Sequence, residues 1–423
     1  MGGATKIMKK YRPLLLSVLG FWLAILPWVL NYTHDDALYK SDTIIGAFLI
    51  VLGFCARYAP RRLFFATAAV CGVWLQLAPL FFWAKQPEMY LNDTLVGVVV
   101  IIFSCLSIKY YELEKDLGGS VPIGWSFNPS DFGPRVFTSC LALVCWFLAR
   151  YLAFYQLGYI DHVIDPFFGE GTIQVITSNV SKMFPVSDAG LGAFVYTIEF
   201  LLGWMGGSRR WKTKPWLALL FGVLVVPAGM VSILLIVSQP IFVGAWCGIC
   251  LVIAVCMLAM ILITVPEVVA AIQFLHHARK REEDMWQVFW RGDLSADFAV
   301  PLAPTRRTWS SELGFAFPKT LVGSLLLGVG LMMAPVLFGI EKPGANILYL
   351  FGPFVVAFTV VAFSEVARSV RWINAIFGII ICITPWVWDG FSSLAAWLVS
   401  LAGFVLLLCS LPRGEIRERY GKW

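Results

Sequence analysis

Two cysteines three residues apart are the side chains in this sequence best placed to do chemistry. Cys247 and Cys250 open an apolar run in GAWCGICL, and their spacing puts both sulfurs on one helical face, within reach of a disulfide. Unpaired amides in a first helical turn favour a thiolate, so we expect a lowered pKa for the first cysteine. The pattern indicates thiol–disulfide exchange. Two alternatives are a pair of small apolar residues and half a zinc site, but no His or Cys completes the latter, so no metal is expected.

The elements that must hold this pair are membrane helices. Of 423 residues, 59% are hydrophobic and only 14% charged, against about 25% charged in an ordinary soluble domain. A soluble enzyme could not hide that much apolar surface. The net charge of +6 sits in short clusters between apolar runs, a topology signal that argues against nucleic-acid binding. The sequence therefore predicts an all-α polytopic protein embedded in the lipid bilayer.

The apolar runs predict about twelve spans, grouped as four, four and four. They fall at 13–31, 43–59, 63–83, 94–110, 136–158, 188–205, 215–238, 247–272, 319–340, 347–367, 372–388 and 391–411. Every second loop is basic, except the charge-balanced linker at 111–135, so the positive-inside rule places both termini in the cytoplasm. Cys247 and the long loop at 159–187 then meet at the extracytoplasmic side. The expected location is a bacterial inner membrane.

Four odd-numbered spans carry a glycine and a proline separated by six residues. The pairs are Gly20 and Pro27, Gly72 and Pro79, Gly328 and Pro335, and Gly378 and Pro385. Glycine permits close helix packing, and proline ends or kinks a helix, here near the outer interface. These regions resemble the SPW repeat, a two-helix membrane module, over about 13–110 and 319–411. The resemblance implies scaffolds or interaction surfaces on either side of a central unit.

The predicted domain order follows from these repeats. It is a four-helix module at 1–112, a cytoplasmic linker at 113–135, a central bundle at 136–273, an amphipathic cytoplasmic connector at 274–318, a second four-helix module at 319–411 and a cytoplasmic tail at 412–423.

The central unit resembles the vitamin K epoxide reductase family over about 136–272. SDAGLGAFVYTIEFLLG (187–203) is similar to the second helix of that family, the seventh span contains PAGMVSILL, and WCGIC opens the eighth. The resemblance implies a four-helix bundle that holds a quinone, of the ubiquinone or menaquinone type, near the outer surface. It also implies that Cys250 faces the quinone and that Cys247 exchanges disulfides.

The chain departs from that family in its loop cysteines. The family has a second cysteine pair after its first helix, which relays electrons, but no cysteine occurs here between Cys145 and Cys247. Thr172 stands near the position expected for a relay cysteine. An internal relay is therefore excluded, and we expect an extracytoplasmic thioredoxin-fold protein or a small thiol to reach Cys247 directly.

The sixth span carries a stripe of candidate supporting residues. Asp188, Gly192, Tyr196 and Glu199 fall within about 80° of one another on a helix. The resemblance places Asp188 where the family has a polar side chain facing a quinone carbonyl, although it could equally cap the helix. Glu199 lies deeper and is either a structural polar contact or a proton relay, with Arg150 as its candidate partner.

The loop at 159–187 supplies the remaining candidates. Phe167 and Phe168 are expected to cap the quinone pocket, and Trp246 to wall it. His162 and Asp165 are candidate proton carriers for the reduced quinone. The alternative is a solvated loop that its aromatic side chains anchor at the interface.

Three functions are compatible with these features. The leading hypothesis is an enzyme, a membrane thiol–disulfide oxidoreductase that passes two electrons from an extracytoplasmic thiol through Cys247 and Cys250 to a quinone. A non-catalytic quinone- or lipid-binding scaffold is the second, and the missing relay pair favours it. A transporter is the third, but few charges lie within the spans and the repeats do not form two matching halves.

Overall fold

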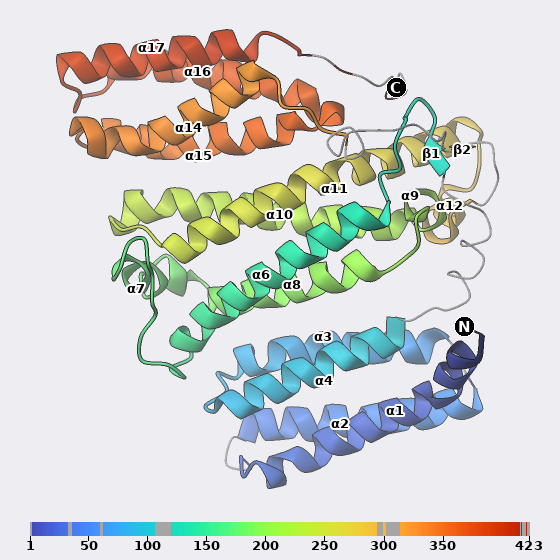
Figure 1. Cartoon of the computed structure of the whole chain (residues 1–423). Coiled ribbons are helices and arrows are strands. Elements are labelled where there is room, and N and C mark those ends of the chain that lie inside the picture. The colour runs from blue at the N-terminus through green and yellow to red at the C-terminus, as the bar shows by residue number, and fades with distance from the viewer. Residues whose placement is uncertain are drawn as a thin grey trace. The chain divides into compact units, whose positions relative to one another are not determined.

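The computed structural model describes residues 2–32, 36–59, 62–105, 120–293, 299–301, 314–414, 416 and 420. Within these ranges the chain is almost entirely helical, as expected (Figure 1). The exception is a two-stranded ribbon of β1 (Ser120–Pro122) and β2 (Ala299–Pro301), antiparallel with Val121 opposite Val300. Parts of the predicted linker and connector, and most of the predicted tail, lie outside the described residues.

The chain divides into two compact units. Unit 1 comprises residues 1–112, 146–164 and 176–201, and unit 2 comprises residues 113–145, 165–175 and 202–423. Unit 1 contains α1 (Gly2–Val29), α2 (Asp36–Tyr58), α3 (Arg62–Phe81), α4 (Pro87–Cys105), the later part of α6 (Phe132–Gln156), η1 (Ser181–Met183) and most of α8 (Asp188–Trp204).

Unit 2 contains the ribbon of β1 and β2 and the remaining helices. They are the first part of α6, most of α7 (Gly171–Ile176), the end of α8, α9 (Arg210–Thr213), α10 (Pro215–Ser238), a π-helical turn η2 (Gln239–Val243), α11 (Gly248–Lys280), α12 (Met285–Arg291), α14 (Lys319–Phe338), α15 (Gly344–Phe363), η4 (Glu365–Val370), α16 (Arg371–Val387) and α17 (Ser393–Ser410). The predicted loop at 159–187 therefore holds two short helices, and the eighth span continues to Lys280 rather than ending near residue 272.

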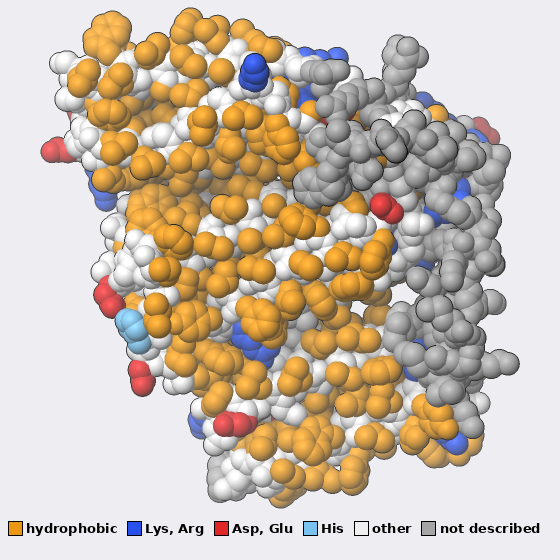
Figure 2. Space-filling view, viewed as in Figure 1, with side chains coloured by type: hydrophobic (Ala, Val, Ile, Leu, Met, Phe, Trp, Pro, Cys, Tyr) orange, Lys and Arg blue, Asp and Glu red, His pale blue; other side chains and the backbone are white. Residues whose placement is uncertain are grey.

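The described helices are those of a multi-pass membrane protein. Eleven are long and apolar enough to cross a bilayer, and a twelfth span results if 171–183 and 188–204, bent by 84°, count together. The separate helix α8 is short for a span at 17 residues. On the face shown in Figure 2, hydrophobic side chains cover most of the described helical surface. Water would not stabilise such a surface, whereas lipid does.

The repeated glycines bring helices together in pairs, as the sequence predicted. The contacting pairs are Gly20 with Gly46, Gly72 with Gly97, Gly328 with Gly352, and Gly378 with Gly403. A Cβ atom added to the second glycine of each pair would lie 2.7 to 3.1 Å from the carbonyl oxygen of the first. The prolines differ slightly from expectation, because each helix continues for two or three residues beyond its proline.

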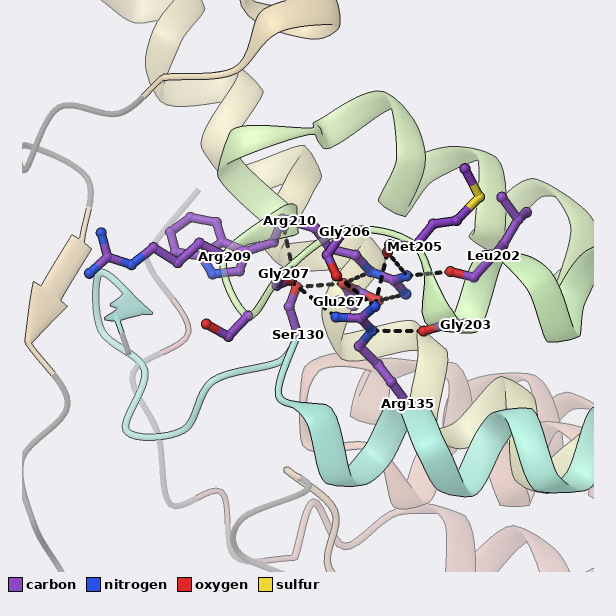
Figure 3. A network of polar contacts seen from close by, with 12 residues as sticks. Ser130, Arg135, Leu202, Gly203, Met205, Gly206, Gly207, Arg209, Arg210 and Glu267 are labelled. Carbon is purple, nitrogen blue, oxygen red and sulfur yellow. Dashed lines mark hydrogen bonds and ion pairs between the residues drawn. The ribbon is translucent and has the colours of Figure 1, made fainter. Parts of the chain in front are cut away.

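A buried ion pair anchors α11 at Glu267 within unit 2 (Figure 3). The Arg210 guanidinium donates to both carboxylate oxygens of Glu267, at 2.5 and 2.6 Å, and the Ser130 hydroxyl donates to the same carboxylate. The side chains of Arg210 and Glu267 are 0% and 3% exposed. Because the two charges and their hydrogen-bonding partners are buried together, the cost of removing them from water is offset.

The same cluster ends α8. Arg135 donates to the carbonyl oxygens of Gly203, Met205, Gly206 and Gly207 at 2.9 to 3.1 Å. Arg210 donates to those of Leu202 and Met205 at 2.7 and 3.1 Å. The last carbonyls of a helix have no partners within it, so these guanidinium groups supply the missing donors.

Candidate functional site: a disulfide at the start of α11

The two cysteines form a disulfide at the first turn of α11. Their Cα atoms are 5.3 Å apart, and Cys247 is the N-cap residue. The amide of Cys250 donates to Cys247 Sγ at 3.1 Å, the contact that a capping side chain makes. The Cys247 side chain is 0% exposed, whereas Cys250 is partly exposed. The two sulfurs therefore differ in how easily another molecule can reach them.

Asp165 clamps the preceding loop onto this turn. Its carboxylate accepts from the amide of Gly248, between the two cysteines, at 2.8 Å. It also accepts from the Thr172 hydroxyl at 2.5 Å and from the amides of Phe167 and Phe168 at 2.8 and 3.2 Å. We call residues 165–172 the Asp165 loop. The bond from Gly248 ties the loop to the turn that carries the disulfide, and the other three contacts fix the conformation of the loop itself.

The charge state of Asp165 follows from these contacts. Burial, at 8% exposure, raises the pKa of a carboxyl group. The hydrogen bonds from Thr172, Phe167, Gly248 and Phe168 more than offset that effect, so the pKa of Asp165 lies below its ordinary value. At neutral pH Asp165 is therefore an ionised hydrogen-bond acceptor. Its role as a proton carrier stays a prediction, and the geometry is that of an anchor.

Two glycines allow the Asp165 loop to approach so closely. A Cβ atom on Gly248 would lie 2.5 Å from Asp165 Oδ1, and one on Gly171 would lie 2.5 Å from the carbonyl oxygen of Trp246. Real Cβ contacts are essentially never that short, so only glycine fits at either position without a shift of the backbone. The glycine inside the C-x-x-C is thus explained by the carboxylate beside it.

The π-helical turn η2 supplies a further contact on Cys247. Gln239, the first residue of η2, is 2% exposed, and its side-chain oxygen accepts from the Cys247 amide at 2.9 Å. π-Turns are rare and frequently occur at functional sites. Gln239 and Asp165 together fix the amides of Cys247 and Gly248, so the backbone of the disulfide turn is held in one geometry.

Aromatic side chains surround the turn. Phe167 and Phe168 are 68% and 45% exposed, and the ring of Phe168 lies 6.5 Å from that of Trp246. Trp246 also contacts Tyr349 of α15 edge-on, at 5.8 Å. The structure thus brings together Phe168, Trp246 and the disulfide, as the sequence suggested, and adds a tyrosine from the C-terminal repeat region.

The candidate residues of α8 lie in unit 1, where Asp188 takes part in a polar cluster of its own. Asp188 Oδ1 accepts from Gln156 Nε2 at 2.6 Å and from the Ser181 hydroxyl at 2.8 Å. Ser187 caps the helix, because its hydroxyl accepts from the amide of Gly190 at 2.9 Å. The alternative of Asp188 as the helix cap was therefore wrong.

The deeper residues of α8 have fewer polar contacts. Tyr196 and Glu199 are 5% and 0% exposed, and neither Glu199 oxygen has a hydrogen-bond partner among the described residues. The expected pairing with Arg150 was wrong, because Arg150 donates to Thr94 at 2.5 Å and lies 4.6 Å from the Tyr90 ring.

Two further candidates in unit 1 make no telling contact. A Cβ on Gly192 would meet only ordinary neighbours, the closest at 3.6 Å, so close packing does not require glycine there. His162 is exposed in its loop. The quinone contact suggested for Gly192 and the proton transfer suggested for His162 stay predictions.

Several residues of the site were not singled out as such by the sequence. Thr172 was noted only as the place of a missing cysteine, and Gln239 and Tyr349 carried no motif. The available signal was polarity in apolar surroundings, since Gln239 follows a 24-residue apolar helix. A buried amide after such a helix has to find partners, which predicts a specific contact without naming it.

Fold and site together define a multi-pass helical membrane protein with a disulfide held at the start of one long helix. Residues 136–265 match the model of the Vitamin K epoxide reductase family, and residues 10–107 and 321–412 match that of the SPW repeat domain. The chain thus has a region similar to the vitamin K epoxide reductase family between two regions similar to the SPW repeat domain. Comparison with curated proteins and with solved structures gave no match.

Proposed function

We propose that this protein is a quinone-linked thiol–disulfide oxidoreductase of the membrane. The observation that carries the proposal is the Cys247–Cys250 disulfide at the N-terminus of α11, inside the region that matches the vitamin K epoxide reductase family. In the proposed topology the disulfide faces the extracytoplasmic side of a bacterial inner membrane, and both termini are cytoplasmic.

The exchange step uses only the two cysteines and a substrate dithiol. One substrate thiolate attacks a sulfur of the Cys247–Cys250 bond, forms a mixed disulfide and displaces the other cysteine as a thiolate. The second substrate thiolate then attacks the substrate sulfur of the mixed disulfide and displaces the remaining cysteine as a thiolate. The substrate leaves oxidised, and Cys247 and Cys250 are left reduced by two electrons. The substrate is an extracytoplasmic thioredoxin-fold protein or a small thiol.

The backbone around the turn stabilises Cys247 as the thiolate that leaves from the mixed disulfide in the second step. Cys247 Sγ already accepts the Cys250 amide, and after reduction this donor would stabilise negative charge on the sulfur. The helix macrodipole acts in the same direction, while the ionised Asp165 on the Gly248 amide opposes it. The balance between these charges sets how readily Cys247 leaves as a thiolate.

The residues beside Cys250 fit a flat apolar ring. Phe167, Phe168 and Trp246 present aromatic surface around the turn that carries the partly exposed Cys250, and such surfaces pack well against planar rings. We propose that they hold the quinone, which when bound would supply the two-electron acceptor that regenerates the disulfide. Asp188, Gly192 and Tyr196 remain proposed contacts on the basis of the resemblance alone.

Access to the two sulfurs supports a division of labour. Cys250 is partly exposed, in keeping with the quinone side, whereas Cys247 is fully buried beside the Asp165 loop. Exchange at Cys247, the sulfur proposed to meet the substrate, then requires the Asp165 loop to move. The motion breaks the hydrogen bond from Gly248 to Asp165, while the three bonds within the loop can stay in place.

Counting free thiols in native membranes tests the proposal. Membranes are quenched with acid, denatured in SDS and treated with a maleimide mass tag that adds one unit per free cysteine. Of ten cysteines, eight lie outside the disulfide. We expect two additional tags after mild reduction, and their loss again when a soluble quinone is added to the reduced membranes.

Matched variants define the reading. Cys250→Ser is expected to show a constant tag count whatever the quinone, whereas Cys256→Ser, outside the disulfide on the same helix, is expected to respond as the wild type does. A pair that stays reduced in the presence of quinone, or a disulfide that no thiol opens, would contradict the proposal. Either result would favour a membrane scaffold.

A further inference from the structure

The N-terminal SPW domain repeats an acidic motif that the redox site does not use. SDTIIG (41–46) lies in α2 and NDTLVG (92–97) lies in α4. In both, the aspartate stands four residues before the glycine that contacts the preceding helix, Gly46 against Gly20 and Gly97 against Gly72. Asp42 and Asp93 therefore occupy the same position in two successive helical hairpins.

Reciprocal hydrogen bonds tie the two hairpins together beside these residues. Trp74 of the second hairpin donates to the Ser41 hydroxyl of the first at 2.9 Å. Trp22 of the first donates to the Asn92 side chain of the second, also at 2.9 Å. Each acceptor immediately precedes its aspartate. The local two-fold relation of the hairpins thus brings Asp42 and Asp93 to corresponding places in one module.

Both aspartates are withdrawn from solvent. Asp42 and Asp93 are 0% exposed, and the Tyr32 hydroxyl donates to Asp42 Oδ2 at 2.6 Å. Asp93 Oδ1 accepts only a long contact of 3.4 Å from Asn92, and its Oδ2 has no hydrogen-bond partner among the described residues. A buried carboxylate oxygen without a hydrogen-bond partner is costly inside a membrane protein unless it binds a proton or a cation.

The charged and titratable groups around Asp93 are few. Asp42, Tyr32 and Tyr159 are close enough to interact with it electrostatically. Arg150 of α6 donates a hydrogen bond to the hydroxyl of Thr94, and its guanidinium group packs against the rings of Tyr90 and Trp146. In the part of the chain that the structure describes, no ion pair joins Asp93 to a cation, and the charged group that acts on it is the carboxyl group of Asp42.

The C-terminal SPW domain shows that the fold does not need these acids. Its contacting glycines are Gly352 and Gly403, and four residues before them stand Leu348 and Val399. Both are buried in an apolar core, at 0% and 3% exposure. The same hairpin frame therefore closes with aliphatic side chains where the N-terminal domain keeps two aspartates.

We propose that Asp42 and Asp93 form an exchangeable proton-binding site of the N-terminal domain, in which the two carboxyl groups share one proton. A shared proton gives the open Asp93 oxygen a partner and removes one of two like charges. Side chains of His, Cys, Asp and Glu do not gather in threes anywhere among the described residues, as a metal site would need. The site does not depend on the redox chemistry proposed for Cys247 and Cys250.

Carbodiimide labelling of the full chain in lipid nanodiscs tests this site, because dicyclohexylcarbodiimide modifies protonated carboxyl groups in apolar surroundings. The labelled residues are located by peptide mass spectrometry across a pH series. We expect modification of Asp93 or Asp42 that falls about tenfold per pH unit above its midpoint. In Asp42→Asn the midpoint for Asp93 is expected at lower pH, because the neighbouring like charge is gone. Glu88, exposed on the same helix, is the internal reference.

Three results would overturn the proposal: no labelling of either aspartate, labelling that does not change with pH, or protection by Na⁺, which would indicate a metal-cation site. A second variant separates a site from a structural contact. Tyr32→Phe with Asp42→Leu and Asp93→Val copies the apolar solution of the C-terminal domain. We expect it to fold with an unchanged or higher melting temperature and to lose the labelling. Failure of this variant to fold would show that the acids are structural.

Discussion

A carboxylate is held in different ways at two positions of α11, Glu267 within the helix and Gly248 at its start. Glu267 is buried with an arginine that matches its charge, and Ser130 completes the contact. Asp165, against the first residue of the same helix, accepts only from backbone amides and a hydroxyl. From Gly248 to Glu267 the helix rises by roughly 28 Å at 1.5 Å per residue, about the thickness of a hydrocarbon core.

This difference separates a fixed position of α11, at Glu267, from its first turn, which can open. Breaking the contact of Glu267 with Arg210 would strand two buried charges, so the cluster opens only when the fold does. Releasing Asp165 leaves neutral donors, which water can satisfy. The disulfide lies at the end whose clamp can be released without separating opposite charges. The following predictions test whether stability and redox access divide in this way.

The largest effect on stability is expected at the buried ion pair of Arg210 and Glu267. Arg210→Met leaves the Glu267 carboxylate buried without its partner, and we expect a loss of about 3–5 kcal/mol in the free energy of unfolding. Unfolding in mixed micelles with increasing SDS measures it. The rate at which a phosphine reduces the Cys247–Cys250 disulfide is expected to stay the same under native conditions.

An exposed ion pair just beyond the C-terminal end of α11 provides the control. Arg281 and Glu283 form an ion pair with side chains 36% and 31% exposed, so Arg281→Met is expected to cost less than about 1 kcal/mol. Adding Glu267→Leu to Arg210→Met should restore part of the stability, since no charge is then left buried alone. A faster disulfide reduction in Arg210→Met at unchanged stability would contradict the division.

An intermediate effect is expected at the opening end. Asp165→Asn removes the charge that strengthens four hydrogen bonds, so the Asp165 loop should open more often. If these contacts contribute about 1.5–3 kcal/mol, reduction of the disulfide by a phosphine accelerates about ten- to hundredfold. Global stability should change much less than in Arg210→Met.

Substitutions at Thr172 test whether a smaller loss of hydrogen bonding to Asp165 gives a smaller acceleration. Thr172→Val removes one donor to Asp165 and should accelerate reduction by only about fivefold, whereas Thr172→Ser keeps the hydroxyl and should match the wild type. Equal reduction rates in Asp165→Asn and the wild type would show that the Asp165 loop does not limit access to Cys247.

The smallest effect is expected from pH. Because the pKa of Asp165 is lowered in the folded protein, its clamp contributes fully above the ordinary Asp value of about 3.9 and is lost as the pH falls through the lowered value. Reduction by a phosphine should therefore accelerate a few-fold only at pH below about 4. In Asp165→Asn this acid-induced acceleration should disappear, and its persistence would assign the effect to another group.

The sequence predicted the helices well because membrane spans depend on local composition. Long apolar runs are helical wherever water is absent, and the glycine–proline spacing correctly identified four tightly packed hairpins. Helix α8 was the least certain span, since it is only 17 residues long. The end of α11 was missed because His276 to Lys280 are polar but continue the helix into the connector.

The site was predicted in part. The spacing of Cys247 and Cys250 was sufficient for a disulfide, because a helical turn fixes the geometry of residues three apart. The contact of Asp165 with Gly248 spans 83 residues, and no periodicity encodes it. Glu267 and the paired aspartates of the N-terminal domain were overlooked although charges inside apolar spans are a usable signal.

The contact between Trp246 and Tyr349 has a consequence for how this chain can be divided. The family match ends at residue 265, yet Tyr349 of the C-terminal repeat packs edge-on against Trp246, the residue before Cys247, and Lys342 donates to the carbonyl of Ile241 at 3.4 Å. A boundary drawn from sequence matches would thus cut through the surroundings of the disulfide. One of the duplicated hairpins therefore contributes residues to the immediate surroundings of the disulfide.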